Sequence, residues 1–460
     1  ANGCELTYDH KLNFLFKKKP NFAVPLNPLA FQYKDRLFTL SVRPILGYFY
    51  FVNEHASEFR RYWGGSMFGY IGRNFGFYAS LRDNGESVAM ARPDYFTLAQ
   101  GQVYKGKPGG GVYFSEMRGG ITVAWNWGSF GLMNDRFEWG NNYHGANILS
   151  GKAPSFPYIQ LHIRPVKWLD FNYIHGWLYS NVIDSSRSYF TSNNDYRVVY
   201  RNKYIATNMF TVTPFKRLNI SFGNSIIYSD INVHPVYLIP FMFFNAVDAS
   251  RTGYTDAASS NSQMFFDVSS RQIKYLHLYA TLFIDELKMS RITDPDLYNF
   301  TSWKAGFRVS DFPLSNLSFT FEWTKTNPIT YKHYIPATTF ASGDYSLGHY
   351  LRDNSYEYYL AIGYKPIRGL LVQASCTLAA HGDEYKYDHQ QGISVDQLPY
   401  MKNKTWQNSE IAVSARYEYT ANAYFFLEYL NSARTGDVRY QTGFMHGKTN
   451  TLVAGVNIGF

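Results

Sequence analysis

The chain has 460 residues, of which 17% are charged and 19% are aromatic, with 40 Tyr, 37 Phe and 9 Trp. So many aromatic residues exclude a disordered chain, and two cysteines, Cys4 and Cys376, are too few for a disulfide framework or a multi-cysteine zinc site. The net charge of +9 comes from scattered Lys and Arg residues, so we expect no nucleic-acid partner.

Residues 1–36 differ from the remainder of the chain. They are rich in Pro and Lys, with one tight basic cluster at residues 17–19 beside Pro20. We expect them to form a segment separate from residues 37–460.

From residue 37 onwards, apolar and polar residues alternate with a period of two, which is typical of strands and not of helices. Between residues 411 and 420, for example, Ile411, Val413 and Tyr417 fall on one face and Ser414 and Arg416 on the other. Many of these strands have about 10–12 residues, the length of a tilted strand that crosses a bilayer. They are predicted to begin near residues 37, 62, 74, 112, 128, 157, 167, 202, 216, 263, 274, 302, 316, 355, 368, 409, 422 and 449.

The connections between these strands alternate between tight turns and long polar segments, the plan of outer-membrane barrels. The sequence therefore predicts an all-β, transmembrane antiparallel barrel of about eighteen strands over residues 37–460, an outer-membrane barrel with short periplasmic turns and long extracellular loops. Residues 1–36 are then expected to form an N-terminal periplasmic segment. Sixteen strands remain possible, because the strand at 263–270 has the weakest pattern. A membrane sheet must close, because lipid offers no partners for an open edge.

The barrel pattern predicts an outer-membrane location in a Gram-negative bacterium, in contact with outer-membrane lipid. The sequence shows no charged segment followed by an apolar core at its start, so we expect a signal peptide that has been removed. The last predicted strand ends on Phe460, similar to the terminal recognition signal of bacterial outer-membrane barrels.

One loop segment carries residue types that suit carbohydrate, because rings stack on sugar C–H faces and amides bond to hydroxyl groups. The candidate carbohydrate-binding residues are Trp139, Asn141, Asn142 and Tyr143, in the third long loop.

A second set of polar residues alternates with the apolar face and is predicted to line the lumen. It comprises Asn219, Ser221, Thr320, Glu322, Arg416 and Glu418. Such residues form either an inner wall that is merely in contact with water or a polar path through the barrel.

Residues 235–244 (PVYLIPFMFF) are unusually apolar for a long loop, yet the apolar run around them is too short for a helix that spans a membrane. Exposed apolar surface is unfavourable in water, so this segment is expected to bury itself. One possibility is a plug inside the lumen, with Tyr237, Leu238, Phe241 and Phe243 as candidate plug residues. The alternatives are packing beneath a partner protein and a lipid-facing strand.

No strong catalytic signature occurs, so we expect no enzyme activity and no cofactor. The group most similar to a metal site combines His381, Asp383, Glu384, Asp388 and His389. We interpret it as a solvated loop, with a calcium site as the alternative, and expect no metal.

Three blocks of the sequence resemble the Wzi-like capsule assembly family of outer-membrane barrels. The first is the run at residues 135–150 (DRFEWGNNYHGANILS) with the hairpin before it, and the second joins residues 235–244 to Asp285-Glu286-Leu287. The third contains Glu322, Asn327, Pro328, Tyr331 and His333, ahead of Leu347-Gly348-His349. Together the blocks span roughly residues 110–360.

The resemblance implies a barrel of about eighteen strands and a role in attaching or organising capsular polysaccharide at the cell surface. The best-known members carry an N-terminal helical bundle, which residues 1–36 are too short to form. We therefore expect a non-enzymatic barrel that binds a surface polysaccharide through its loops. The alternatives are an outer-membrane diffusion channel and an accessory subunit, with protein partners, of a larger complex for secretion, gliding or envelope assembly.

Overall fold

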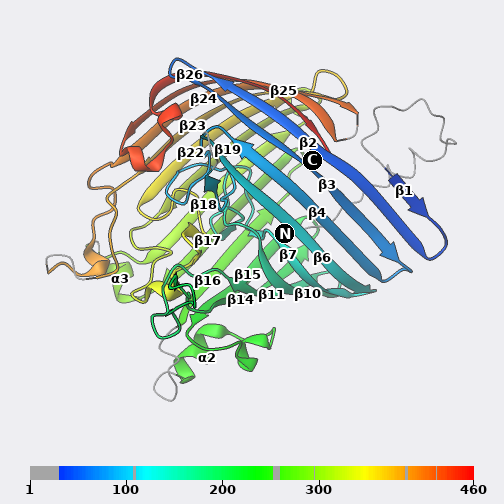
Figure 1. Ribbon diagram of the computed structural model, residues 1–460. Helices are drawn as coiled ribbons and strands as arrows, with labels where there is room; N and C mark the ends of the chain where they lie inside the picture. The colour runs from blue at the N-terminus through cyan, green and yellow to red at the C-terminus, as the bar shows by residue number, and fades with distance from the viewer. Residues whose placement is uncertain are drawn as a thin grey trace.

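The computed structural model describes residues 31–106, 110–251, 260–294, 296–388, 392–420 and 422–459, and within them eighteen antiparallel strands close into one barrel (Figure 1). The barrel strands are β2 (Phe38–Val52), β3 (Ser57–Ile71), β4 (Phe75–Glu86), β6 (Val112–Trp125), β7 (Gly128–Asp135), β10 (Phe156–Val166), β11 (Leu169–Leu178), β14 (Lys203–Phe215), β15 (Leu218–Ser229), β16 (Ser260–Ser270), β17 (Leu276–Glu286), β18 (Phe300–Ser310), β19 (Leu317–Thr326), β22 (Ser355–Tyr364), β23 (Leu370–His381), β24 (Trp406–Thr420), β25 (Ala423–Gly436) and β26 (Gly447–Ile458).

The predicted barrel of eighteen strands is confirmed, including the strand with the weakest pattern, which is β16. Most strands begin within three residues of their predicted start, and the largest difference is at β3, which begins at Ser57 and not near 62. Residues 1–30 of the expected N-terminal segment and the terminal Phe460 lie outside the described residues.

The barrel closes where β2 pairs with β26, with Leu46 opposite Ile458 and Val52 opposite Leu452. The short strand β1 (Phe31–Lys34) pairs with the first residues of β2, on the edge that β26 leaves free. Among the described residues, each of the eighteen barrel strands therefore has a neighbouring strand on both sides, as a sheet in lipid requires.

Tight turns join the strands at one end of the barrel, and longer loops join most of them at the other, where only the four-residue connection between β2 and β3 is short among the described residues. The turn between β3 and β4 is three residues long and uses Gly72 at a φ of 63°, where glycine carries no steric penalty. By the plan of outer-membrane barrels, the turn end is periplasmic and the loop end extracellular.

The loops carry the remaining short elements. These are β5 (Lys105–Gly106), β8 (Glu138–Trp139), β9 (Leu149–Ser150), β12 (Tyr189–Phe190), β13 (Tyr196–Arg197), β20 (Ala341–Ser342), β21 (Tyr345–Ser346), α2 (Phe244–Arg251), α3 (Ser290–Thr293), and the 3-10 turns η1 (Pro235–Leu238), η2 (Pro336–Thr338), η3 (Val395–Gln397), η4 (Val438–Tyr440) and η5 (Gly443–Met445). None of the helices in the described parts of the chain is long and apolar enough to cross a membrane.

Alternation along each strand separates an apolar outer wall from a more polar inner wall, as the sequence predicts. On β26, Leu452 and Val456 are exposed on the outside, whereas Thr449 and Thr451 are buried on the inside. A large apolar cluster inside the barrel combines wall residues such as Phe265 and Phe283 with loop residues such as Trp139 and Tyr331. The loops therefore fold into the lumen at this end and fill it.

The segment expected to plug the lumen lies elsewhere. Figure 1 shows α2 outside the barrel, beside β14, β15 and β16. Tyr237 and Phe244 pack against Phe171 and Tyr228, which belong to the outward face of the wall. The prediction that Tyr237, Leu238, Phe241 and Phe243 form a lumen plug is therefore wrong, because the outer wall offers this segment a matching apolar surface.

Candidate functional site

The loop between β7 and β10, residues 136–155, enters the lumen and forms its plug. Trp139 is only 7% exposed, and its ring centroid lies 4.8 Å from that of Phe137 and 5.9 Å from that of Phe265 on β16. The backbone N–H of Asn141 donates to Asp267 Oδ2 at 2.8 Å. These contacts join the loop to the inner face of β16.

The same loop also reaches strands further around the barrel. The N–H of Tyr143 donates to Glu322 Oε1 on β19 at 2.7 Å, and its hydroxyl lies 2.9 Å from His277 Nδ1 on β17. The ring of His144 stacks on Tyr359 of β22 with centroids 3.9 Å apart. Because strands from β16 to β22 hold the loop, it lies fixed against the inner wall and does not hang freely in the lumen.

The structure corrects the position of the predicted carbohydrate group, because Trp139, Asn141, Asn142 and Tyr143 lie in this plug and not on an exposed loop. The ring of Trp139 is buried, and Asn141 binds Asp267. The Asn142 amide donates to Glu138 Oε1 at 2.8 Å and to Gly140 O at 3.0 Å. These residues hold the plug together, which leaves their predicted contact with sugar untested.

The predicted lumen-lining residues all lie on strand positions that face inward, though in two different environments. Ser221, Thr320 and Glu322 are buried among the plug and the wall. Asn219 is half-buried, and Arg416 and Glu418 on β24 are exposed. The inner wall therefore keeps an accessible polar surface near the turn end of β24.

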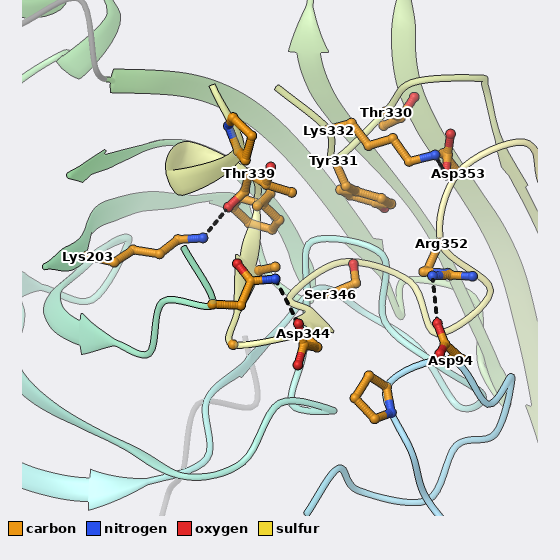
Figure 2. Close-up of a pocket in the computed structure, with 16 residues that line it drawn as sticks. Asp94, Lys203, Thr330, Tyr331, Lys332, Thr339, Asp344, Ser346, Arg352 and Asp353 are labelled. Atoms are coloured by element: carbon orange, nitrogen blue, oxygen red, sulfur yellow. Dashed lines mark hydrogen bonds and ion pairs between the residues drawn. The ribbon is translucent and has the colours of Figure 1, made fainter. Parts of the chain in front are cut away.

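A cavity of about 410 Å³ lies among the loops and is the candidate binding site (Figure 2). The loop between β4 and β6 contributes Asp94, the connection between β11 and β14 contributes Asn181, and the loop between β19 and β22 contributes residues 330–353. Lys203, the first residue of β14, completes the wall.

Three basic side chains line this cavity together with three carboxylates, those of Asp94, Asp344 and Asp353. Figure 2 shows Lys203 on one side and Lys332 and Arg352 on the other. Lys332 Nζ lies 3.0 Å from Asp353 and 2.9 Å from Glu384, and Arg352 lies 3.6 Å from Asp94 and 3.3 Å from Glu384. These two cations are therefore neutralised by neighbouring carboxylates.

Lys203 is different, because it is buried without a countercharge. It is 4% exposed, and its Nζ donates to the backbone oxygen of Thr339 at 2.8 Å. Among the described residues, no carboxylate lies within ion-pair distance of it. A buried ammonium group without a partner is costly, and an anionic ligand in the cavity would relieve that cost.

Neighbouring charges shift the pKa values of two groups beside the cavity, the Glu384 carboxyl and the Lys332 amine. Burial opposes ionisation of Glu384, but Lys332 and Arg352 outweigh it and lower the pKa of Glu384 to about 2. Burial would lower the pKa of Lys332, but Asp353 and Glu384 outweigh it and raise this pKa above its usual value. Both groups are therefore ionised at neutral pH and tie the two loops together.

The carboxylates of the group considered as a calcium site are engaged by other side chains. Glu384 pairs with cations, and the Asp383 carboxylate accepts hydrogen bonds from Asn403 at 3.0 and 3.3 Å. In the described part of the chain, no group of three or more His, Cys, Asp or Glu residues is arranged to hold a metal ion. His389 lies outside the described residues.

The site residues predicted from the sequence do not include Lys203, Lys332 and Arg352. These three residues are separated by up to 149 positions, and only the closed barrel brings their loops together. The sequence contains one weak indication of this site. Lys203 is the first residue of a strand whose other inward-facing residues are uncharged.

No family model matches this sequence, and no curated protein matches it. Among solved structures, the chain is similar to Escherichia coli Wzi, described as a carbohydrate-binding β-barrel involved in group 1 capsule assembly. The identity is 9%, the match covers 91% of this chain and 84% of Wzi, and the TM-score is 0.54. It is also similar to Pseudomonas aeruginosa OccD3 (OpdP), with 12% identity, 94% of both chains covered and a TM-score of 0.50. These likenesses confirm the barrel fold expected from the resemblance and, at such low identity, extend to the fold alone.

Proposed function

We propose that this protein is a non-enzymatic barrel of the Gram-negative outer membrane that binds a surface polysaccharide at its loop end. In this role it attaches or organises capsular polysaccharide at the cell surface. The barrel wall holds the cavity among the loops at the membrane, and contacts with the plug fix the positions of these loops.

The observation that carries this proposal is the cavity at the loop end, which rests directly on the plug. Tyr331, which lines the cavity, donates its hydroxyl proton to Asn147 O of the plug at 2.6 Å. The N–H of Ser150 in the plug donates to Leu347 O at 2.8 Å. A preorganised site of this kind loses little conformational entropy when a ligand binds.

The chemistry of the cavity favours a polysaccharide with carboxylate or phosphate groups. The buried ammonium of Lys203 suits one such anion. Asn181 and Ser346 line the same cavity and provide an amide and a hydroxyl group for sugar hydroxyls.

Deletion of the gene tests the proposal directly. We expect cells without the protein to release capsular polysaccharide into the medium, and a plasmid copy of the gene to restore it to the surface. Staining of surface polysaccharide and assay of the medium measure both effects. Unchanged surface retention in the deletion strain would contradict the proposed function.

A diffusion channel is the second candidate, favoured by the exposed inward residues Arg416 and Glu418 near the turn end. Planar bilayer recordings separate the two candidates. A polysaccharide-binding barrel with a fixed plug should give no steady conductance, whereas a channel should conduct with its full chain. Replacing residues 137–154 with a short glycine linker should open a steady current and act as the positive control.

A further inference from the structure

Residues 231–251 form an external segment that packs on the outer wall of the barrel. Tyr237 and Phe244 are 2% and 0% exposed, and they pack among outward side chains of β11, β14 and β15. The ring of Phe241 lies 4.5 Å from Phe171 on β11. The segment therefore lies on the outside of the barrel wall.

The outer wall provides hydrogen-bond partners for the irregular backbone of this segment. Asn208 Nδ2 on β14 donates to Pro240 O and Met242 O, each at 2.8 Å. The Tyr173 hydroxyl donates to Tyr237 O at 2.6 Å. Irregular backbone is tolerated at membrane depth only when protein satisfies its polar groups, and these bonds meet that condition for three carbonyl groups of the segment.

A row of phenylalanines shows how far the segment descends along the wall. Phe171, Phe210, Phe222 and Phe266 face one another in register on four neighbouring strands. Phe222 lies four residues beyond Leu218, where β15 leaves its turn, which corresponds to about 13 Å along the strand. This row lies within an apolar band about 25 Å tall, and Phe241 contacts it.

The outer side of the segment is apolar and exposed. Leu238, Ile239, Phe241 and Phe243 are between 40% and 58% exposed. Residues 231–247 contain no Asp, Glu, Lys or Arg. The patch continues directly into the exposed outward residues Ile220 and Phe266 of the neighbouring wall.

We propose that Leu238, Ile239, Phe241 and Phe243 contact the acyl chains of the bilayer, so that residues 231–247 form a lipid-inserted segment on the outer wall. Its depth, its lack of charge and its continuity with the lipid-facing band all point to acyl chains as the occupant. The inference rests on the proposed membrane location and is independent of the proposed ligand. The segment also explains why two polar residues, Asn208 and Asn224, occur on the outward face, because it buries both of them.

Nitroxide labelling tests this proposal. Phe241→Cys and Phe243→Cys are made separately in a Cys4→Ser, Cys376→Ser background, labelled, and reconstituted into phosphatidylcholine vesicles. Collision of the label with oxygen and with a water-soluble nickel chelate is then measured by power saturation. Leu452→Cys on the outward face of β26 is the lipid control, and Tyr189→Cys in the exposed strand β12 is the water control.

We expect labels at 241 and 243 to match the lipid control, with an oxygen-to-nickel ratio several-fold above that of Tyr189→Cys. Nickel collision equal to the water control would overturn the inference. Protection from both reagents, with spin–spin broadening, would also overturn it by indicating a second copy of the chain as the occupant. A water-like ratio at Leu452→Cys would overturn the membrane location itself.

Discussion

The backbone N–H of Tyr143 donates a 2.7 Å hydrogen bond to the carboxylate of Glu322, 179 positions further along the chain. Glu322 is buried on the inner face of β19, where Lys304 of β18 lies 3.7 Å away. Lys304 Nζ in turn donates to His144 O of the plug at 3.1 Å. The plug is therefore held by a buried charge pair, and the pair is expected to decide whether the lumen stays closed.

Glu322→Gln should loosen the plug. Lys304 would remain buried without its countercharge, a change that costs about 3–5 kcal/mol when one partner of a buried pair is removed. We expect intermittent currents in planar bilayers and a lower temperature of unfolding on semi-native gels.

Glu418→Gln is the matched control, because Glu418 faces the same lumen but is exposed near the turn end. It should leave both measurements unchanged. Currents from Glu322→Gln no larger than those of Glu418→Gln would mean that the plug does not depend on this pair.

The strands were predictable from the sequence because alternation is a local property of the chain. On β24, Ile411 and Val413 face outward and Ser414 and Arg416 face inward, as their order alone requires. Loop placement depends on contacts between distant strands, which a single sequence does not display. For this reason Trp139 was expected at the surface and lies in the lumen instead.

The sequence nevertheless contains a local indication of where the external segment, residues 231–251, lies. Asn224 interrupts the outward face of β15, between Phe222 and Ile226, and Asn208 does the same on β14. A polar residue on a lipid-facing row requires a protein partner. Two such residues on neighbouring strands indicated that a loop covers this part of the outer wall.

Lys203→Met should weaken polysaccharide binding while keeping the barrel folded. Methionine has a similar length but removes the charge that suits an anionic sugar, and it also removes a buried cation without a countercharge. We expect affinity for an acidic oligosaccharide, measured by calorimetry, to fall by about tenfold, equal to about 1.4 kcal/mol.

Lys402→Met is the control, because Lys402 is exposed on a loop and does not line the cavity. It should bind as the unmodified protein does. Equal losses in the two variants would indicate a general effect of net charge and contradict a specific role for Lys203.

Acid should release the loop that carries Glu384. Its pKa of about 2 lies below its usual value of 4.5, because the attraction of Lys332 and Arg352 outweighs burial. The folded loop thus binds fewer protons than the unfolded one, so this stabilisation is complete above pH 4.5 and is lost as the pH falls towards 2. Pepsin should cut residues 382–388 faster at pH 2.5 than at pH 4, after correction for the activity of pepsin on an unfolded substrate.

Glu384→Gln provides the comparison, since glutamine does not titrate in this range. Its corrected cleavage rate should be high at both pH values. If the unmodified protein shows the same corrected rate at the two pH values, the ion pairs with Lys332 and Arg352 do not stabilise this loop.

Asn208→Leu should detach the external segment and leave the barrel intact. The change keeps the branched shape of the side chain but removes the two hydrogen bonds to Pro240 O and Met242 O, and also the acceptor for Asn224 Nδ2. Each polar group left buried and unsatisfied costs about 1–3 kcal/mol. We expect faster trypsin cleavage at Arg251 than in the unmodified protein, with unchanged heat resistance of the barrel. Asn431→Leu, on the outward face of β25 where the amide bonds only to Asn450 Oδ1 among the described residues, should not change that cleavage. Equal cleavage of the Asn208→Leu variant and the unmodified protein would mean that apolar packing alone, through Tyr237 and Phe244, holds the segment to the wall.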